Sequence, residues 1–156
     1  MTKAAETAGN TEPWWQFPLA EISPGQWERL CDGCGKCCLY KLQDEDSDEV
    51  FYTAVACRFL DHDLIRCRCY TERVQKNPDC LMISPENIDS LYSWLPVTCA
   101  YRLRFLGKPL VDWHPLVSGN PESVIEAGQS VKYHCINEIE IDDYVDWEEL
   151  VLADLL

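Results

Sequence analysis

The sequence predicts an α+β fold: a small single domain of short helices and strands organised around a cysteine metal cluster. At 156 residues with 47% hydrophobic residues, the chain can bury one core of its own. Short segments with strand-like alternation stand beside segments with helix-capping signals. Ten cysteines are present, and nine of them fall between residues 31 and 99.

The N-terminus differs in composition from the rest of the chain. The stretch TKAAETAGNTEP is small and polar, so residues 1–13 are predicted to be a mobile tail and residues 14–156 the metal-binding domain. Trp14 and Trp15 follow in PWWQFPL. We expect this segment to fold back and cover the core with aromatic rings, whereas an exposed pair would indicate a partner surface.

Hydropathy and charge narrow the class of protein. No apolar run approaches the ~20 residues that span a bilayer, and the N-terminus lacks the layout of a secretory signal. We therefore expect a cytoplasmic protein with no membrane partner, in a reducing compartment where thiols stay free unless a metal or a catalytic cycle holds them. The formal charge of −14 would repel a phosphate backbone, which disfavours nucleic acid. A protein partner stays open.

The first half of the chain predicts a helix followed by two strands. Ser23, Pro24 and Gln26 in SPGQWERLC make a capping-box signal for a short helix over 23–31. LYKLQ at 39–43 alternates as a strand, and the acidic run at 44–49 reads as a solvated turn. VFYTAVAC at 50–57 is rich in β-branched and aromatic residues, so a buried strand would deliver Cys57 at its end.

The second half predicts further short elements. A helix is expected from Ser84 through Trp94, and another over 99–107 that Gly107 ends. A short helix follows Asn120, residues 130–141 alternate like a strand, and Asp146 can cap a final helix WEELVLADLL. We find no Gly-rich phosphate loop and no Ser, His and Asp signature, so the sequence favours no enzyme class.

The segment CDGCGKCC at residues 31–38 carries the strongest signal, because it contains two consecutive C-x2-C steps. A C-x2-C turn lets two thiolates converge on one ion, and the glycines at 33 and 35 allow the sharp backbone that points amide N–H groups at sulfur. Cys31, Cys34 and either Cys37 or Cys38 could supply most of one coordination shell. Adjacent side chains diverge, so one of the pair is expected to serve a second ion, bridge two ions or stay outside.

A second group of cysteines follows, and together with the first it supplies nine candidate ligands. Two closed tetrahedral sites need eight thiols, which leaves room for two zinc ions or for one iron–sulfur cluster plus another site. Basic residues stand directly beside cysteines at 36, 58, 66 and 68, where they would favour thiolate. The candidate metal ligands are Cys31, Cys34, Cys37, Cys38, Cys57, Cys67, Cys69, Cys80 and Cys99.

The histidines and the tenth cysteine are weaker candidates. His114 in DWHPLVSG is either a metal ligand, a buried hydrogen-bonding residue or a pocket residue. His62 lies in an acidic turn that reads as exposed. His134 and Cys135 are adjacent in the predicted strand and should face opposite sides, so Cys135 is interpreted as a small buried hydrophobe.

CDGCGKCC, the five cysteines that follow it up to residue 99 and the segment WHPLVSG resemble the YcgN-type family of small bacterial proteins. That family is similar to a branch of the YkgJ-like CxxCxxCC group, described as zinc- or iron-chelating domains. The resemblance covers roughly residues 14 to 150 and maps onto the nine candidate cysteines and His114. Cys135, His62 and His134 match no pattern position, and YTERVQKNPDC departs from the Tyr-x2-Arg-Pro-x2-Cys stretch usual in the group.

Three functions compete on these observations. The first is a metal-binding protein that holds zinc or iron through clustered thiolates in a structural or chelating role. The second is an iron–sulfur protein that transfers electrons or senses oxidants. The third is a hydrolytic zinc enzyme, which an all-thiolate shell disfavours because such enzymes keep an open position among His and carboxylate ligands.

Overall fold

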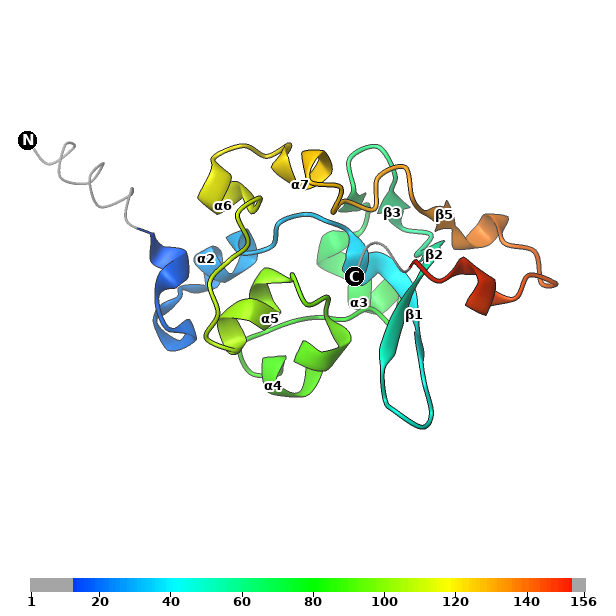
Figure 1. Ribbon diagram of the computed structural model, residues 1–156, viewed down its shortest axis with the longest axis horizontal. Helices are drawn as coiled ribbons and strands as arrows, with labels where there is room; N and C mark the ends of the chain where they lie inside the picture. The colour runs from blue at the N-terminus through cyan, green and yellow to red at the C-terminus, as the bar shows by residue number, and fades with distance from the viewer. Residues whose placement is uncertain (1–12, 153–156) are drawn as a thin grey trace, which may run out of the picture.

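The computed structural model describes residues 13–152, so residues 1–12 of the predicted tail and the last four residues of the chain lie outside the described part. Its short helices and strands confirm the α+β class (Figure 1). The helices are α2 (Pro24–Arg29), α3 (Arg73–Lys76), α4 (Ile88–Leu91), α5 (Ala100–Phe105), α6 (Pro115–Ser118) and α7 (Ser123–Glu126). The strands are β1 (Leu39–Gln43), β2 (Val50–Ala56), β3 (Leu60–Asp61), β4 (Arg66–Cys67) and β5 (Ile136–Asn137).

The larger sheet has the strand order β1-β2-β5. The two strands predicted at 39–43 and 50–57 are β1 and β2, and they pair as an antiparallel hairpin, with Leu39 opposite Ala56 and Gln43 opposite Val50. The acidic turn between them is closed by the Asp44 carboxylate, which accepts the amide hydrogens of residues 46 and 47 at 2.8 and 2.9 Å. Strand β5 runs parallel to β2 over two residues only. This sheet therefore rests mainly on the local hairpin.

The helical part begins at the predicted capping box. The Ser23 hydroxyl accepts the Gln26 amide at 3.2 Å and the Gln26 side chain accepts the Ser23 amide at 2.9 Å, which confirms the start of α2. On the buried face of α2, the Trp27 ring lies 4.6 Å from the ring of Tyr101 in α5. The Tyr101 hydroxyl donates to the Trp27 carbonyl at 2.7 Å. These contacts join α2 to the helices that follow the cysteine-rich region.

Buried side chains form two separate small cores. The first packs α2 against α4 and α5, and includes Trp14, which confirms that this segment covers the core. The second lies under the hairpin. The first core comprises Trp14, Trp27, Leu30, Ile88, Leu95, Ala100, Tyr101 and Leu110, and the second Leu39, Tyr52, Ala56, Leu60, Ile65 and Val131. Neither core alone has the size of a typical domain interior, so the contacts between them matter for stability.

Three predicted elements differ from the structure. The strand expected over 130–141 is wrong except for β5, because Tyr133 adopts a left-handed backbone (φ 72°) and Asn137 caps a 3-10 turn at Glu138–Glu140. The helix expected from Ser84 begins only at α4, and a 3-10 turn at Tyr92–Trp94 continues it. Asp146 does cap the next segment, but the described part is a 3-10 turn over Trp147–Leu150.

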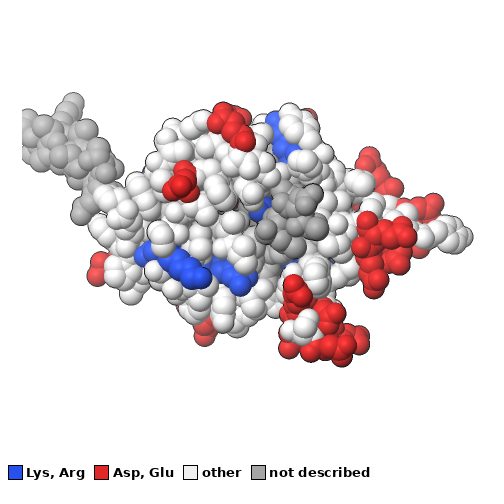
Figure 2. Space-filling view, in the orientation of Figure 1, with Lys and Arg blue, Asp and Glu red and all other residues white. Residues whose placement is uncertain are grey.

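Acidic side chains gather at one end of the molecule. Figure 2 shows them over the β1–β2 turn and over the segment that follows β5. The solvated turn predicted at 44–49 is confirmed by its exposed residues. Within residues 13–152, no helix combines the length and the apolar character needed to cross a membrane.

A substitution at Gly35 tests how closely the segment at residues 31–38 packs against the second core. Gly35 has φ +80°, and an added Cβ would lie 2.6 Å from both Ile65 Cγ2 and Val131 Cγ2. Gly33 has a similar φ of +76°, but an added Cβ would meet nothing within 4 Å. We expect Gly35→Ala to lower the free energy of unfolding by about 3 kcal/mol, and Gly33→Ala by about 1 kcal/mol, since only the first adds steric overlap to backbone strain.

Urea denaturation of both variants with metal removed measures these changes. Equal losses in the two variants would show that the close approach of Gly35 to the second core does not matter.

Candidate metal centre

The loop CDGCGKCC leaves the end of α2 and forms two successive turns that donate amide hydrogens to sulfur. The Gly33 amide donates to Cys31 Sγ at 3.4 Å, and the Lys36 amide donates to Cys34 Sγ at 3.5 Å. Both turns use the left-handed backbone of a glycine, at Gly33 and Gly35. This confirms the predicted backbone shape. Such N–H···S bonds stabilise negative charge on sulfur, which is the form of cysteine that binds metal.

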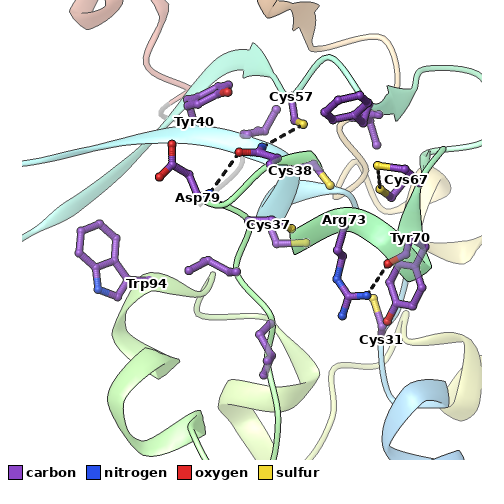
Figure 3. Close-up of a pocket in the computed structure, with 18 of the residues that line it drawn as sticks. Cys31, Cys37, Cys38, Tyr40, Cys57, Cys67, Tyr70, Arg73, Asp79 and Trp94 are labelled. Atoms are coloured by element: carbon purple, nitrogen blue, oxygen red, sulfur yellow. Dashed lines mark hydrogen bonds between the residues drawn. The ribbon is translucent and has the colours of Figure 1, made fainter. Parts of the chain in front are cut away.

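A pocket of about 360 Å³ lies beside this loop, and seven of the ten cysteines line it. Figure 3 labels five of these cysteines, whose sulfur atoms lie around the pocket: Cys31, Cys37, Cys38, Cys57 and Cys67. The other walls are largely aromatic and aliphatic and come from both cores, with Leu39 and Leu60 on one side and Tyr101 on the other. The lining cysteines are Cys31, Cys37, Cys38, Cys57, Cys67, Cys69 and Cys80.

Backbone contacts bring the second cysteine group to the loop. Cys57 follows β2, as predicted, and its amide donates to the Cys38 carbonyl at 2.9 Å. Cys67 ends β4, and its sulfur lies 3.7 Å from that of Cys69. Cys80 lies after α3, in a turn where its amide donates to the Asn77 carbonyl at 3.0 Å. Three short elements therefore present their thiols to one side of the loop.

Two predicted ligands, Cys34 and Cys99, do not line the pocket. Partial burial raises the pKa of Cys99 to about 12, and the negative charge of Cys37 acts in the same direction. Burial also raises the pKa of Cys34, with further contributions from Asp32, Cys37 and Cys31. These two thiols therefore share the electrostatic surroundings of Cys31 and Cys37 although they do not line the pocket.

Cys37 is the thiol most ready to ionise. Its pKa is lowered to about 7, first by a hydrogen bond with the Cys38 thiol and then by the charge of Lys41, against the effect of burial. The same hydrogen bond and burial raise the pKa of Cys38. The Lys41 ammonium is held over the loop because it donates to the carbonyls of Cys37 and Leu39, at 3.2 and 2.8 Å.

The cations and donors that face the pocket differ partly from those that the sequence singled out. Arg58 pairs with Glu138 at 2.7 Å and Arg68 with Asp61 at 3.7 Å. Lys41 and Arg73 line the pocket instead. The Asn77 amide group donates to Cys57 Sγ at 3.4 Å, a third contact that favours charge on sulfur.

The sequence pointed to cations that directly precede or follow a cysteine. Lys41, Arg73 and Asn77 are not adjacent to any cysteine in the chain. The alternation of LYKLQ was the one available signal, because it places Lys41 on the same face of β1 as Leu39.

The donor set fits zinc or iron, which prefer thiolate ligands, and fits poorly the oxygen-seeking ions magnesium and calcium. All ten cysteines lie within residues 13–152 and none is in a disulfide. The thiols surround the pocket without closing on a point, since no three Cys, His, Asp or Glu side chains of the described chain are grouped closely enough to hold an ion. The described residues therefore contain the predicted cysteine-rich region but show no assembled metal cluster.

His114 lies apart from the thiols, at the start of α6. It is 1% exposed, its Nε2 lies 2.7 Å from the Leu30 carbonyl, and its Nδ1 accepts the Leu116 amide at 3.0 Å. Both ring nitrogens are thus engaged with backbone groups. His62 Nδ1 lies 3.8 Å from Cys135 Sγ, away from the pocket.

Comparison with known proteins is consistent with this site. Residues 30–100, which contain the nine candidate cysteines, match the family model described as "CxxCxxCC: Putative zinc- or iron-chelating domain". No solved structure matches the chain.

Relatives extend the match beyond the cysteine region. A UPF0260 protein of Rhodobacter capsulatus is 47% identical over 149 residues, covering 95% of this chain and 99% of the relative. A UPF0260 protein of Cellvibrio japonicus is 52% identical over 136 residues, covering 86% and 92%. A third, of Proteus mirabilis, is 45% identical over 143 residues, covering 91% and 95%. At this identity and coverage, the chain belongs to the UPF0260 family.

Proposed function

We propose that this protein binds zinc or iron through its clustered thiolates, in a structural or chelating role. The observation that carries the proposal is the pocket with seven thiols on its walls, next to a loop whose amides already donate to sulfur. Cations at the pocket favour the same charge state of the thiols. The match to a zinc- or iron-chelating domain family points in the same direction.

The nine candidate cysteines divide into two neighbourhoods, which we propose as the ligands of two ions. Cys31, Cys34, Cys37 and Cys99 influence one another's charge around the loop. Cys38 is influenced first by Cys37 and then by Cys57 and Cys67, and Cys69 by Cys67 and Cys57, so the Cys37–Cys38 contact joins the two neighbourhoods. Cys80 is influenced by thiols of both groups. Ligation would require the thiols to move inward, which short loops around an open pocket permit.

A bound metal would join the two cores of the fold. The pocket has walls from both, so an ion held by the loop and by Cys57, Cys67 or Cys80 would cross-link segments that otherwise make few mutual contacts. Thiolate zinc sites contribute ~10 kcal/mol or more of binding free energy, part of which is spent on ordering the ligands. Metal would then stabilise the fold as well as define the function.

An iron–sulfur cluster in an electron-transfer or redox-sensing role is the second candidate, and the size of the pocket favours it. A volume of about 360 Å³ far exceeds the ~30 Å³ that one water molecule occupies in the liquid, so an inorganic cluster of several atoms would fit. Amide donors to sulfur, as at Cys31 and Cys34, tune the reduction potential of such clusters.

We also propose a cellular location, domain bounds, a family branch and a role for His114. We place the protein in the cytoplasm, where free thiols persist, and treat residues 14–156 as the metal-binding domain. The order of CDGCGKCC, the later cysteines and WHPLVSG supports assignment to a YcgN-type branch. We assign His114 a packing role and leave it out of the ligand set, because its ring nitrogens are engaged with Leu30 and Leu116.

Cys34→Ser tests the ligand assignment against Cys135→Ser. We expect Cys34→Ser to lower the metal content per chain and the melting temperature together, because a serine hydroxyl is a poor ligand for zinc or iron. Cys135→Ser alters a half-buried thiol outside the pocket and should keep the metal content. Elemental analysis by mass spectrometry and thermal denaturation measure both properties. Unchanged metal in Cys34→Ser, or equal loss in Cys135→Ser, would contradict the assignment.

The identity of the metal separates the two candidate functions. The untagged protein is purified anaerobically from cells supplied with iron and zinc, and its metals and visible spectrum are recorded. One or two zinc ions per chain in a colourless sample support the structural or chelating role. Iron with labile sulfide and a broad absorption band near ~400 nm would instead support the iron–sulfur candidate.

His114→Ala separates packing from ligation. Loss of the imidazole leaves the buried Leu30 carbonyl without its partner, so we expect the free energy of unfolding to fall by about 2 kcal/mol. The metal content per chain should stay at the wild-type value when the variant is purified at low temperature. A variant that folds but lacks metal would show that His114 is a ligand.

A further inference from the structure

Lys36 is a buried charge at the centre of the cysteine loop. Its side chain is among the largest fully buried ones of the described chain, at 1% exposure. The ammonium donates to Gln129 Oε1 at 2.8 Å and lies 3.5 Å from Thr98 Oγ1. Both partners are uncharged, and none of the ion pairs formed within residues 13–152 involves Lys36. A buried ammonium without a charged partner is strongly destabilising.

The negative groups near this ammonium belong to the candidate metal centre. Burial lowers the pKa of Lys36, and the negative charges that oppose this effect are those of Cys34, Asp32 and Cys99. Cys34 Sγ accepts the amide of Lys36 itself, and Thr98 directly precedes Cys99. Asp32 is the only carboxylate among them, and its Oδ1 accepts the Cys34 amide at 3.0 Å. The ammonium is therefore buried beside Thr98, the residue before Cys99, and its charge interacts with those of Cys34 and Cys99.

Lys41, the other lysine close to the cysteine loop, differs from Lys36 in the groups that its ammonium contacts. It is half-buried, donates to two backbone carbonyls and lies 5.1 Å from the centre of the Tyr52 ring. Carbonyl dipoles and the aromatic face stabilise its charge, and nearby Cys37, Cys38 and Cys80 also raise its pKa, against the larger effect of burial. Within the described chain the Lys36 ammonium hydrogen-bonds to no backbone carbonyl and lies over no aromatic ring, and its partners are the Gln129 side-chain oxygen and the Thr98 hydroxyl. Its charge has to be compensated from elsewhere.

We propose that Lys36 is the internal counter-cation of the metal–thiolate centre, placed to offset the negative charge that Cys34 and Cys99 bring when they bind an ion. Four thiolates around a divalent ion carry a net charge of −2, which a nearby buried cation stabilises. This inference rests on the proposed metal-binding function. It assigns a role in affinity to a residue that is not a ligand.

A purely mechanical role for Lys36 is the competing explanation. The hydrogen bond to Gln129 ties the loop to the segment before β5, and the Val131 amide donates to the Cys34 carbonyl at 2.9 Å in the same region. If this connection were the whole role, any side chain that preserves the hydrogen bond would serve. Charge and hydrogen bonding can be varied separately at this position.

The experiment measures zinc affinity of the full-length protein by competition with a chromophoric chelator, together with the melting temperature of the metal-free form. Lys36→Met removes the charge and the hydrogen bond, Lys36→Gln removes the charge and keeps a donor, and Lys36→Arg keeps both. Lys108→Met is the matched control, since it removes the same charge at an exposed position. If Lys36→Met does not fold, the zinc affinity of Lys36→Gln is compared with that of the wild-type protein instead.

We expect Lys36→Met and Lys36→Gln to bind zinc about tenfold more weakly or worse, and Lys36→Arg and Lys108→Met to stay near wild type. The metal-free forms of Lys36→Met and Lys36→Gln should melt close to wild type, because removing a buried unpaired charge offsets the lost contact. Wild-type affinity in Lys36→Gln would overturn the inference in favour of the mechanical role. Absence of zinc and iron from the wild-type protein would instead refute the proposed function itself.

Discussion

The rest of the structure depends on the junction between two small hydrophobic cores, and that junction is lined with thiols. The helical core around Trp27 and Tyr101 and the sheet core around Tyr52 each bury few side chains. The cysteine loop runs between them, and the pocket has walls from both. A junction of this kind is stabilised most effectively by a ligand that bonds to both sides, because each core alone buries too little surface for a stable domain.

The loop itself is shaped by backbone constraints more than by side-chain packing. Gly33 and Gly35 adopt left-handed conformations, and the resulting turns direct amides at Cys31 and Cys34. Gly35 also lets the loop approach Val131 so closely that no larger residue fits without displacement. Cys31 Sγ and Cys34 Sγ therefore each accept one amide hydrogen from the loop itself. Sites arranged in this way lose little free energy to reorganisation when the charged form of the ligand appears.

Charge is distributed unevenly between the surface and this interior. The surface carries the acidic excess at one end of the molecule (Figure 2), while Lys36, Lys41 and Arg73 lie at the loop and the pocket. Interior cations act on the thiols at short range and are screened little by salt, whereas the surface carboxylates are screened by solvent. Within this acidic protein, Lys41 lowers the pKa of Cys37, and Arg73 opposes the effect of burial that raises the pKa of Cys80.

The sequence alone determined the capping box at Ser23, the hairpin of β1 and β2 and the amide-to-sulfur turns, because each depends on residues close together in the chain. It also identified the cysteines to consider. Only the tertiary structure decided that Lys41 and Asn77 contact the cysteine region, that Lys36 is buried, and that His114 turns to Leu30. The strand predicted from the alternation at 130–141 is wrong because the left-handed backbone of Tyr133 and the cap at Asn137 interrupt it. Contacts between segments far apart in the chain leave no periodic signal, since they depend on how the two cores meet.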